Sequence, residues 1–80
     1  MSYCHEQAIY DAANNVFQIT STIAINMPKA QQPDIIDTGI QWLKKRCEDM
    51  PLSNEIIAKQ IDSAWNNCKA YIPKQFHPMF

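Results

Sequence analysis

The chain has 80 residues, enough for one small domain but not for a second core. Its formal net charge is −1, so the composition gives no sign of the basic surface that nucleic-acid-binding proteins usually carry. The single glycine, Gly39, excludes every glycine-rich phosphate-binding loop. No run of apolar residues approaches the roughly 18 that a membrane-spanning helix requires, so we expect no membrane segment.

The three cysteines, Cys4, Cys47 and Cys68, are an odd number and are widely spaced. Small secreted proteins usually carry an even set of cysteines, and the first residues have neither the basic nor the apolar region of a signal peptide. We therefore expect three free thiols that pack as small apolar side chains on helix faces, and a cytoplasmic location.

Five prolines divide the chain, because proline is poorly tolerated inside a helix. Between them lie three segments with helical periodicity, at about 2–27, 34–50 and 54–72, and a short apolar tail at 73–80. Amphipathic helices joined by short loops pack side by side in alternating directions. The predicted fold is therefore all-α, a three-helix antiparallel bundle that forms a single domain over residues 1–80.

The first predicted helix has a wide apolar face, and Ser2 is its expected N-cap. Its apolar arc spans roughly 200°, whereas contact with one neighbouring helix needs a stripe of only about 100°. The arc comprises Tyr3, Ile9, Tyr10, Ala12, Ala13, Val16, Phe17, Ile19, Ile23 and Met27. This helix therefore needs cover from more than one direction.

Residues 17–25 leave a local ambiguity, because they are rich in β-branched side chains and alternate with the period of a strand. A strand needs a partner for its backbone groups, and the sequence offers no second strand-like run. We therefore predict that the helix continues through this segment, with 20–22 as the place where it could fray or kink.

The second and third helices have clear boundary signals. Pro33 suits the first turn of the second helix. Ser53 is the expected N-cap of the third helix, and Leu52 before it can pack on Ile57 one turn later. Apolar residues recur at 36, 40, 43, 47 and 50, and again at 57, 61, 64, 68 and 71. This spacing places one apolar stripe on each helix.

Residues with chemical potential are present but poorly arranged for catalysis or metal binding. No pair of cysteines or histidines has the spacing of a zinc site. Cys4 and His5 are adjacent, and neighbours on a helix point about 100° apart rather than toward each other. The carboxylates of the second helix have simpler roles at the helix end and in pairs with lysines one turn away. We predict no enzyme, no catalytic residue, no metal and no cofactor.

The basic triplet Lys44, Lys45 and Arg46 is the only hint of nucleic acid. On a helix these side chains fan over about 200°, and four carboxylates on the same helix would repel phosphate. Nucleic acid is therefore an unlikely partner, although a dimeric DNA-binding or transcription-modulating protein stays open as the alternative function. In that case dimerisation would have to bring the triplets of two copies together.

A surplus of apolar and aromatic residues marks the candidate protein-binding surface. Its members are Tyr3, Tyr10, Phe17, Trp42, Phe76, Met79 and Phe80. Two interpretations stay open: the tail folds back over the edge of the first helix and closes the core, or the edge stays exposed for a partner. Because the first helix is longer than its neighbours, we expect a homodimer built mainly on it.

The function predicted from these observations is that of a small, non-enzymatic protein-binding module. Such a chain would act as a regulator, adaptor or inhibitor, of the kind common in bacteria and phages, by occupying a surface on a larger protein.

Overall fold

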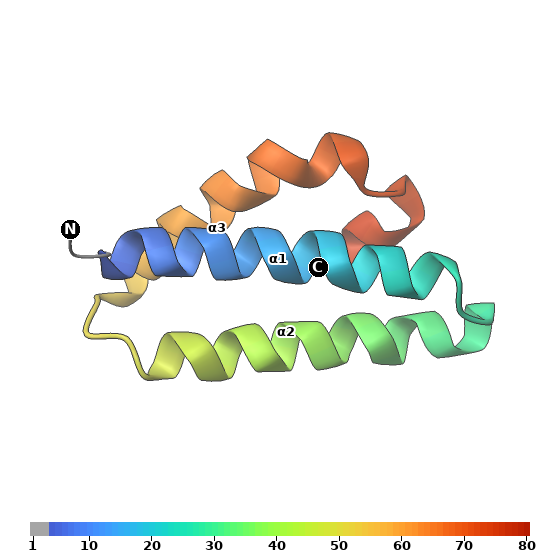
Figure 1. Cartoon of the computed structure of the whole chain (residues 1–80), viewed down its shortest axis with the longest axis horizontal. Helices are drawn as coiled ribbons and strands as arrows, with labels where there is room; N and C mark the ends of the chain where they lie inside the picture. Colours follow the sequence, from blue (N-terminus) through green and yellow to red (C-terminus); the bar gives the residue numbers. More distant parts are fainter. Residues whose placement is uncertain (1–3) are drawn as a thin grey trace.

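The computed structural model describes residues 4–80, and these form an all-α fold without strands (Figure 1). Three α-helices, α1 (His5–Ile25), α2 (Gln32–Glu48) and α3 (Asn54–Cys68), carry most of the chain. Three short 3₁₀ helices connect or follow them: η1 (Lys29–Gln31), η2 (Lys69–Tyr71) and η3 (Lys74–Met79). The predicted fold class is confirmed. Among the described residues, no helix is both long and apolar enough to cross a membrane.

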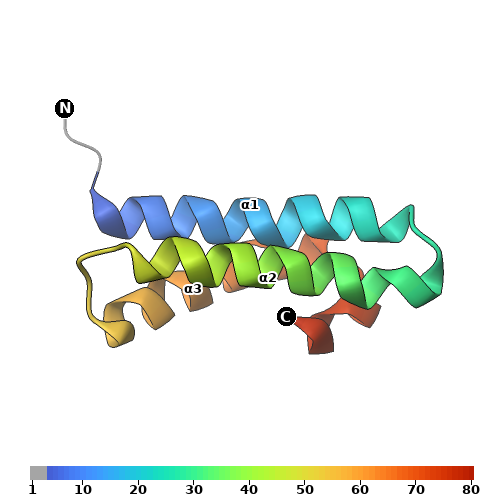
Figure 2. The same cartoon turned by 90° about the horizontal axis from the view of Figure 1, so that it is seen from below.

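In Figure 1, helix α1 lies between α2 and α3, and Figure 2 shows α1 and α2 running side by side with α3 behind α2. Both α2 and α3 pack mainly on α1 rather than on each other. Helix α2 runs antiparallel to α1, and α3 returns in the direction of α1. The molecule is consequently elongated, measuring 41 × 23 × 23 Å along its principal axes.

Helix α1 begins later and ends earlier than the predicted span of 2–27. The expected cap, Ser2, lies outside the described residues. Instead, the Sγ atom of Cys4 accepts a hydrogen bond from the backbone N–H of Gln7 at 3.4 Å. Cys4 was predicted on an apolar helix face, but it is exposed at the helix end. The prediction of an apolar position for Cys4 is wrong, because the N-cap position points the side chain at the free backbone N–H groups of the first turn.

The ambiguous segment 17–25 is helical to its end, so the predicted continuation of the helix is confirmed. Thr20, Ser21 and Thr22 donate their hydroxyl hydrogens to backbone carbonyl oxygens one turn earlier in the helix. These bonds satisfy hydroxyl groups that would otherwise compete with the backbone, two of which are buried. Because these hydroxyl groups form their hydrogen bonds within the helix, residues 17–25 can be helical although they are rich in β-branched side chains.

Helix α2 keeps the predicted length of 17 residues but begins and ends two residues earlier than 34–50, whereas α3 begins at the predicted residue and is shorter. Pro33 lies in the first turn of α2, and the buried Gln32 donates its Nε2 hydrogen to the carbonyl oxygen of Met27 at 3.2 Å. The Oγ atom of Ser53 accepts from the backbone N–H of Ile56 at 3.3 Å and caps α3. Helix α3 ends four residues before the predicted 72, because the chain tightens into η2 ahead of Pro73.

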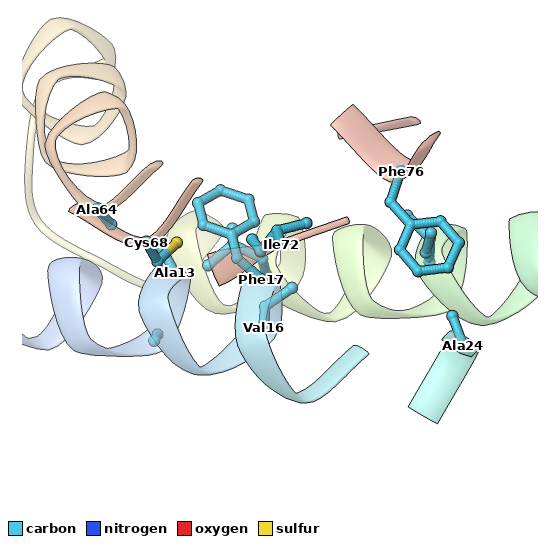
Figure 3. Close-up of a cluster of buried hydrophobic side chains, with 11 residues drawn as sticks. Ala13, Val16, Phe17, Ala24, Ala64, Cys68, Ile72 and Phe76 are labelled. Atoms are coloured by element: carbon cyan, nitrogen blue, oxygen red, sulfur yellow. The ribbon is translucent and has the colours of Figure 1, made fainter. Parts of the chain in front are cut away.

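The core lies on the sides of α1 that face α2, α3 and the tail. It contains Ala12, Ala13, Val16, Phe17, Ala24, Ile36, Leu43, Ala64, Cys68, Ile72 and Phe76. Figure 3 shows Cys68 beside Ala13, and the ring of Phe76 near Ala24. The tail is therefore an ordered part of the core, with its first aromatic residue fully buried.

Helices α1 and α2 come close together at Gly39. A Cβ atom placed on Gly39 would overlap Cγ2 of Thr20 and would lie 3.3 Å from Cγ1 of Val16. Gly39 itself has no positive φ angle, so its role is to leave space rather than to permit an unusual backbone conformation. The only glycine of the chain thus sets the distance between the two helices.

We predict that Gly39→Ala destabilises the fold, because the added methyl group overpacks the helix contact at a cost of about 1–3 kcal/mol. Alanine also favours a helix over glycine by up to about 1 kcal/mol, so the net effect is smaller than the packing cost alone. Thr20→Ser removes the Cγ2 atom and keeps the hydroxyl. Urea unfolding of the two single variants and the double variant checks this: the double variant should regain part of the loss, and strictly additive losses would contradict the assigned contact.

Candidate protein-binding surface

The structure divides the predicted protein-binding residues into buried and exposed groups. Phe17 and Phe76 are 5% and 0% exposed, so they are core residues. In the folded chain Trp65 and Phe80 pack on Phe17, and Phe76 lies inside the core, so neither side chain is exposed for a partner. Tyr10 and Phe80 are half-buried, whereas Trp42 and Met79 are exposed. Tyr3 lies outside the described residues.

An aromatic cluster explains how the tail covers α1. The ring of Phe17 packs edge-on against the rings of both Trp65 and Phe80, with 5.2 Å between centroids in each case. Trp65 also packs against Phe80 at 5.6 Å and against the ring of His77 at 5.0 Å. Such edge-to-face pairs stabilise beyond the area that they bury. The tail therefore closes the core at this edge, which is one of the two interpretations left open by the sequence.

The ring of His77 also joins the tail to the preceding turn. Its Nε2 atom lies 3.1 Å from the carbonyl oxygen of Lys69 and 3.0 Å from that of Ile72. Because both neighbours are acceptors, Nε2 must carry the hydrogen. This fixes the tautomer of the neutral ring and holds η3 against the end of α3.

A different apolar surface remains uncovered on the pair α1 and α2. We call it the α1/α2 strip and define it by the side chains of Ile19, Ile23, Ile35, Thr38 and Trp42 around Gly39, which line one shallow hollow. Ile19, Ile23 and Trp42 are 56%, 46% and 54% exposed. Together these three present roughly 300 Å² to solvent, comparable with the largest apolar patch of a typical monomer.

The α1/α2 strip faces away from α3. Phe17 points at α3, as its contact with Trp65 shows. Ile19 lies two residues further and therefore about 160° around the helix axis from Phe17. Ile23 follows Ile19 by four residues and shares its side of the helix. Consequently α3 and the tail cover one face of the α1/α2 pair, and nothing in the described chain covers the other.

The α1/α2 strip carries no charged side chain. Its hollow is completed by Asn15, Val16 and Thr20, which are polar or apolar but uncharged. A second hollow continues from Trp42 along the same helices and ends at Arg46 and Asp11. The surface is therefore an uncharged apolar centre with charged groups at its border, which is the arrangement of protein interfaces.

A cleft of about 550 Å³ opens between α2 and α3 on the opposite side of the molecule. Apolar side chains line most of it, chiefly those of Leu43, Ile57, Ile61, Trp65 and Phe80. Lys44, Glu48, Asp62 and His77 also take part in its lining. Such a cleft could not be predicted from the sequence, because it exists where α2 and α3 both pack on α1 rather than on each other.

The basic triplet does not form one surface. Lys44 lines the cleft between α2 and α3, whereas Arg46 lines the hollow on the α1 side of α2. Lys45 is exposed between them, and Glu48 and Asp49 follow directly. Within one chain, the triplet therefore offers no continuous basic stripe of the kind that phosphate backbones require.

The cysteines differ in burial and reactivity. All three are free; Cys4 is exposed, Cys47 is half-buried and Cys68 is buried. Desolvation by burial raises the pKa of the Cys47 thiol and of the Cys68 thiol above their ordinary value of 9.0. Over residues 4–80, no three side chains of histidine, cysteine, aspartate or glutamate come together in a group that could hold a metal ion.

Comparison with known proteins gives no match: no protein family, no curated protein and no solved structure shows significant similarity to the chain.

Ile19, Ile23 and Ile35 were not among the sequence-predicted contact residues, although Trp42 was. The signal that could have identified them was the width of the apolar arc on the first helix. Ile19 and Ile23 lie on that arc, on the side opposite to Phe17. The sequence favours the aromatic edge as the contact surface because aromatic residues are frequent interface anchors. In this chain the aromatic edge is the covered side, and the aliphatic edge is the exposed one.

We predict that Phe76→Ala destabilises the chain by about 3–5 kcal/mol, because it removes a fully buried ring from the core. Met79→Ala on the same tail is the matched control, and it should cost no more than about 0.5 kcal/mol because Met79 is exposed. Urea unfolding followed by circular dichroism gives both values. Equal, small effects would show that the tail does not close the core.

We also predict that the three thiols react in the order Cys4, Cys47, Cys68. At pH 7.5 or so, an aromatic disulfide reagent should modify Cys4 rapidly and Cys68 only after unfolding, since reaction requires an accessible thiolate. The raised pKa values of Cys47 and Cys68 mean that the folded chain retains these protons at a pH where the unfolded chain has lost them. Stability should therefore fall as the pH rises above about 9. Rapid reaction of Cys68 in the folded chain would contradict its burial.

Proposed function

We propose that the chain is a small, non-enzymatic protein-binding module and that the α1/α2 strip is the surface through which it binds. The observation that carries this proposal is the exposure of Ile19, Ile23 and Trp42 side by side on one uncharged face. Exposed apolar patches of this size on small proteins commonly mark contact sites. A regulator, adaptor or inhibitor of the kind predicted from the sequence would use this patch to occupy a surface on a larger protein.

The expected partner is a folded protein that presents an apolar, uncharged surface of similar size. A charged ligand would lose its hydration at the strip without gaining a partner of opposite charge, because the lining residues are uncharged. A second copy of the chain, giving the homodimer expected from the sequence, meets this description. The other apolar surface, the cleft between α2 and α3, differs from the strip because the charged side chains of Lys44, Glu48 and Asp62 take part in its lining.

The proposal predicts that Ile19→Glu abolishes binding while the chain stays folded. Ile19 is 56% exposed, so the substitution should leave the helical circular dichroism spectrum unchanged, but it places a charge in the centre of the contact. Ile56→Glu is the matched control, because Ile56 is also an exposed isoleucine and lies on α3. Tagged forms of the three proteins are compared by affinity capture from the native host.

The expected result is that a protein retained by the wild-type chain and by Ile56→Glu is lost from Ile19→Glu. The retained protein can be an untagged copy of the chain or a different protein. Identical retention by all three forms would show that the strip is not the binding surface.

A further inference from the structure

We infer that the partner on the α1/α2 strip is a second copy of this chain, related by a two-fold axis that runs across α1 and α2 and passes close to the Thr20–Gly39 contact. In this dimer α1 faces α1 of the partner and α2 faces α2 of the partner, each pair antiparallel. The inference rests on the proposed function, since it uses the same strip.

The size of the face supports self-association. Helix α1 has 21 residues and α2 has 17, so the pair is about 30 Å long and, with two helices side by side, about 20 Å wide. A projected face of about 600 Å² is of the order of the 800 Å² or so that each partner contributes to a standard stable interface. The whole length of the two helices can therefore take part.

The absence of charge at the centre suits a two-fold axis. In a symmetric dimer, each residue near the axis meets its own copy, so a charged residue there would repel itself. The strip has Ile19 and the small residues Gly39 and Thr38 near its centre, and none of them is charged. Ile19 is next to Thr20 on α1, at about the level of the axis, and would pack against Ile19 of the partner. The protruding Trp42 would pack over the level of Ile35 and Thr38 on the partner's α2.

Charge complementarity along α2 selects the antiparallel arrangement. Asp34 and Lys45 are both exposed and lie on the border of the strip, on the side of Trp42 that points away from Gly39. They are 11 residues apart, which is about 16 Å along the helix and only about 20° around it. Their midpoint is close to Gly39. A two-fold axis at that point places Asp34 of each chain opposite Lys45 of its partner.

The other face-to-face arrangement lacks this match. With the axis parallel to the helices, α2 would lie over α1 of the partner, and α1 carries no lysine or arginine over its whole length. Asp34 would then have no basic side chain opposite it. The positions of acidic and basic residues on α2 therefore favour contact between the two α2 helices.

Sedimentation equilibrium of the full chain tests the inference. We expect the wild-type protein and Ile56→Glu to have the mass of two chains at micromolar concentration, and Ile19→Glu to have the mass of one chain with an unchanged helical spectrum. A wild-type chain that stays monomeric up to a concentration on the order of 100 µM overturns the inference. If that monomer still loses a different captured protein on Ile19→Glu, the proposed function stands and only the second copy is excluded.

A charge exchange tests the arrangement without disturbing the apolar centre. Asp34→Lys or Lys45→Asp alone should weaken the dimer about tenfold, because each turns two attractive pairs into repulsive ones, and the double variant should recover most of the affinity. Asp37→Lys and Lys44→Asp are the matched controls, since they make the same exchanges on α2 but point away from the strip. Failure of the double variant to recover, or an equal loss in the controls, overturns the antiparallel α2 pairing.

Discussion

The contact between Thr20 and Gly39 determines the distance between α1 and α2, and the exposed surface follows from it. Because Gly39 has no side chain, the backbone of α2 comes close to α1, and Thr20 fills the space. The two helices contact each other along one line. Side chains of α1 and α2 that lie to either side of that line can be covered only by another part of the chain or by a partner. On one side α3 and the tail provide that cover. On the other side Ile19, Ile23 and Trp42 remain exposed.

The tail covers part of the apolar surface of α1 that α2 and α3 leave exposed. An apolar arc of about 200° cannot be covered by two neighbouring helices, so a third apolar element is needed. Residues Lys74–Met79 fold as η3 against the end of α3, and Phe76 and Phe80 reach α1 from there. The tail has only a few residues after Pro73, and it covers the aromatic edge near Phe17 but not the aliphatic edge near Ile19.

The local features of the fold could be predicted from the sequence, because they depend on neighbouring residues. The capping serine at Ser53, the helix start at Pro33 and the periodic stripes each predicted the right element. The predicted ends are less accurate: the third helix is predicted to continue to residue 72, whereas α3 ends at Cys68 and residues 69–71 form a 3₁₀ helix. Periodicity does not distinguish the last turn of an α-helix from a 3₁₀ turn that continues its apolar side.

The candidate surface could be predicted only in part, because it depends on which side of α1 each neighbour occupies. Helical spacing shows that Phe17 and Ile19 lie on opposite borders of the apolar arc, but it does not show which border is covered. That choice follows from tertiary contacts: Trp65 and Phe80 meet Phe17, and no residue of the described chain lies over Ile19. Trp42 is a predicted contact residue because tryptophan is a frequent interface anchor. Ile19 and Ile23 are predicted only as part of the apolar arc of the first helix.

The small size of the chain gives the uncovered strip a thermodynamic consequence. A domain of this length buries only about two thirds of its unfolded surface, so few further apolar contacts are available to offset the loss of chain entropy. None of the three cysteines forms a disulfide, and residues 4–80 contain no cluster that could hold a structural metal. An associating protein surface is the remaining common source of stability for a chain of this size. Binding at the strip would then contribute to folding as well as to recognition, and stability would depend on the concentration of the partner. Association would bury the exposed side chains of Ile19 and Ile23, and the folded state of the chain would in this way respond to assembly.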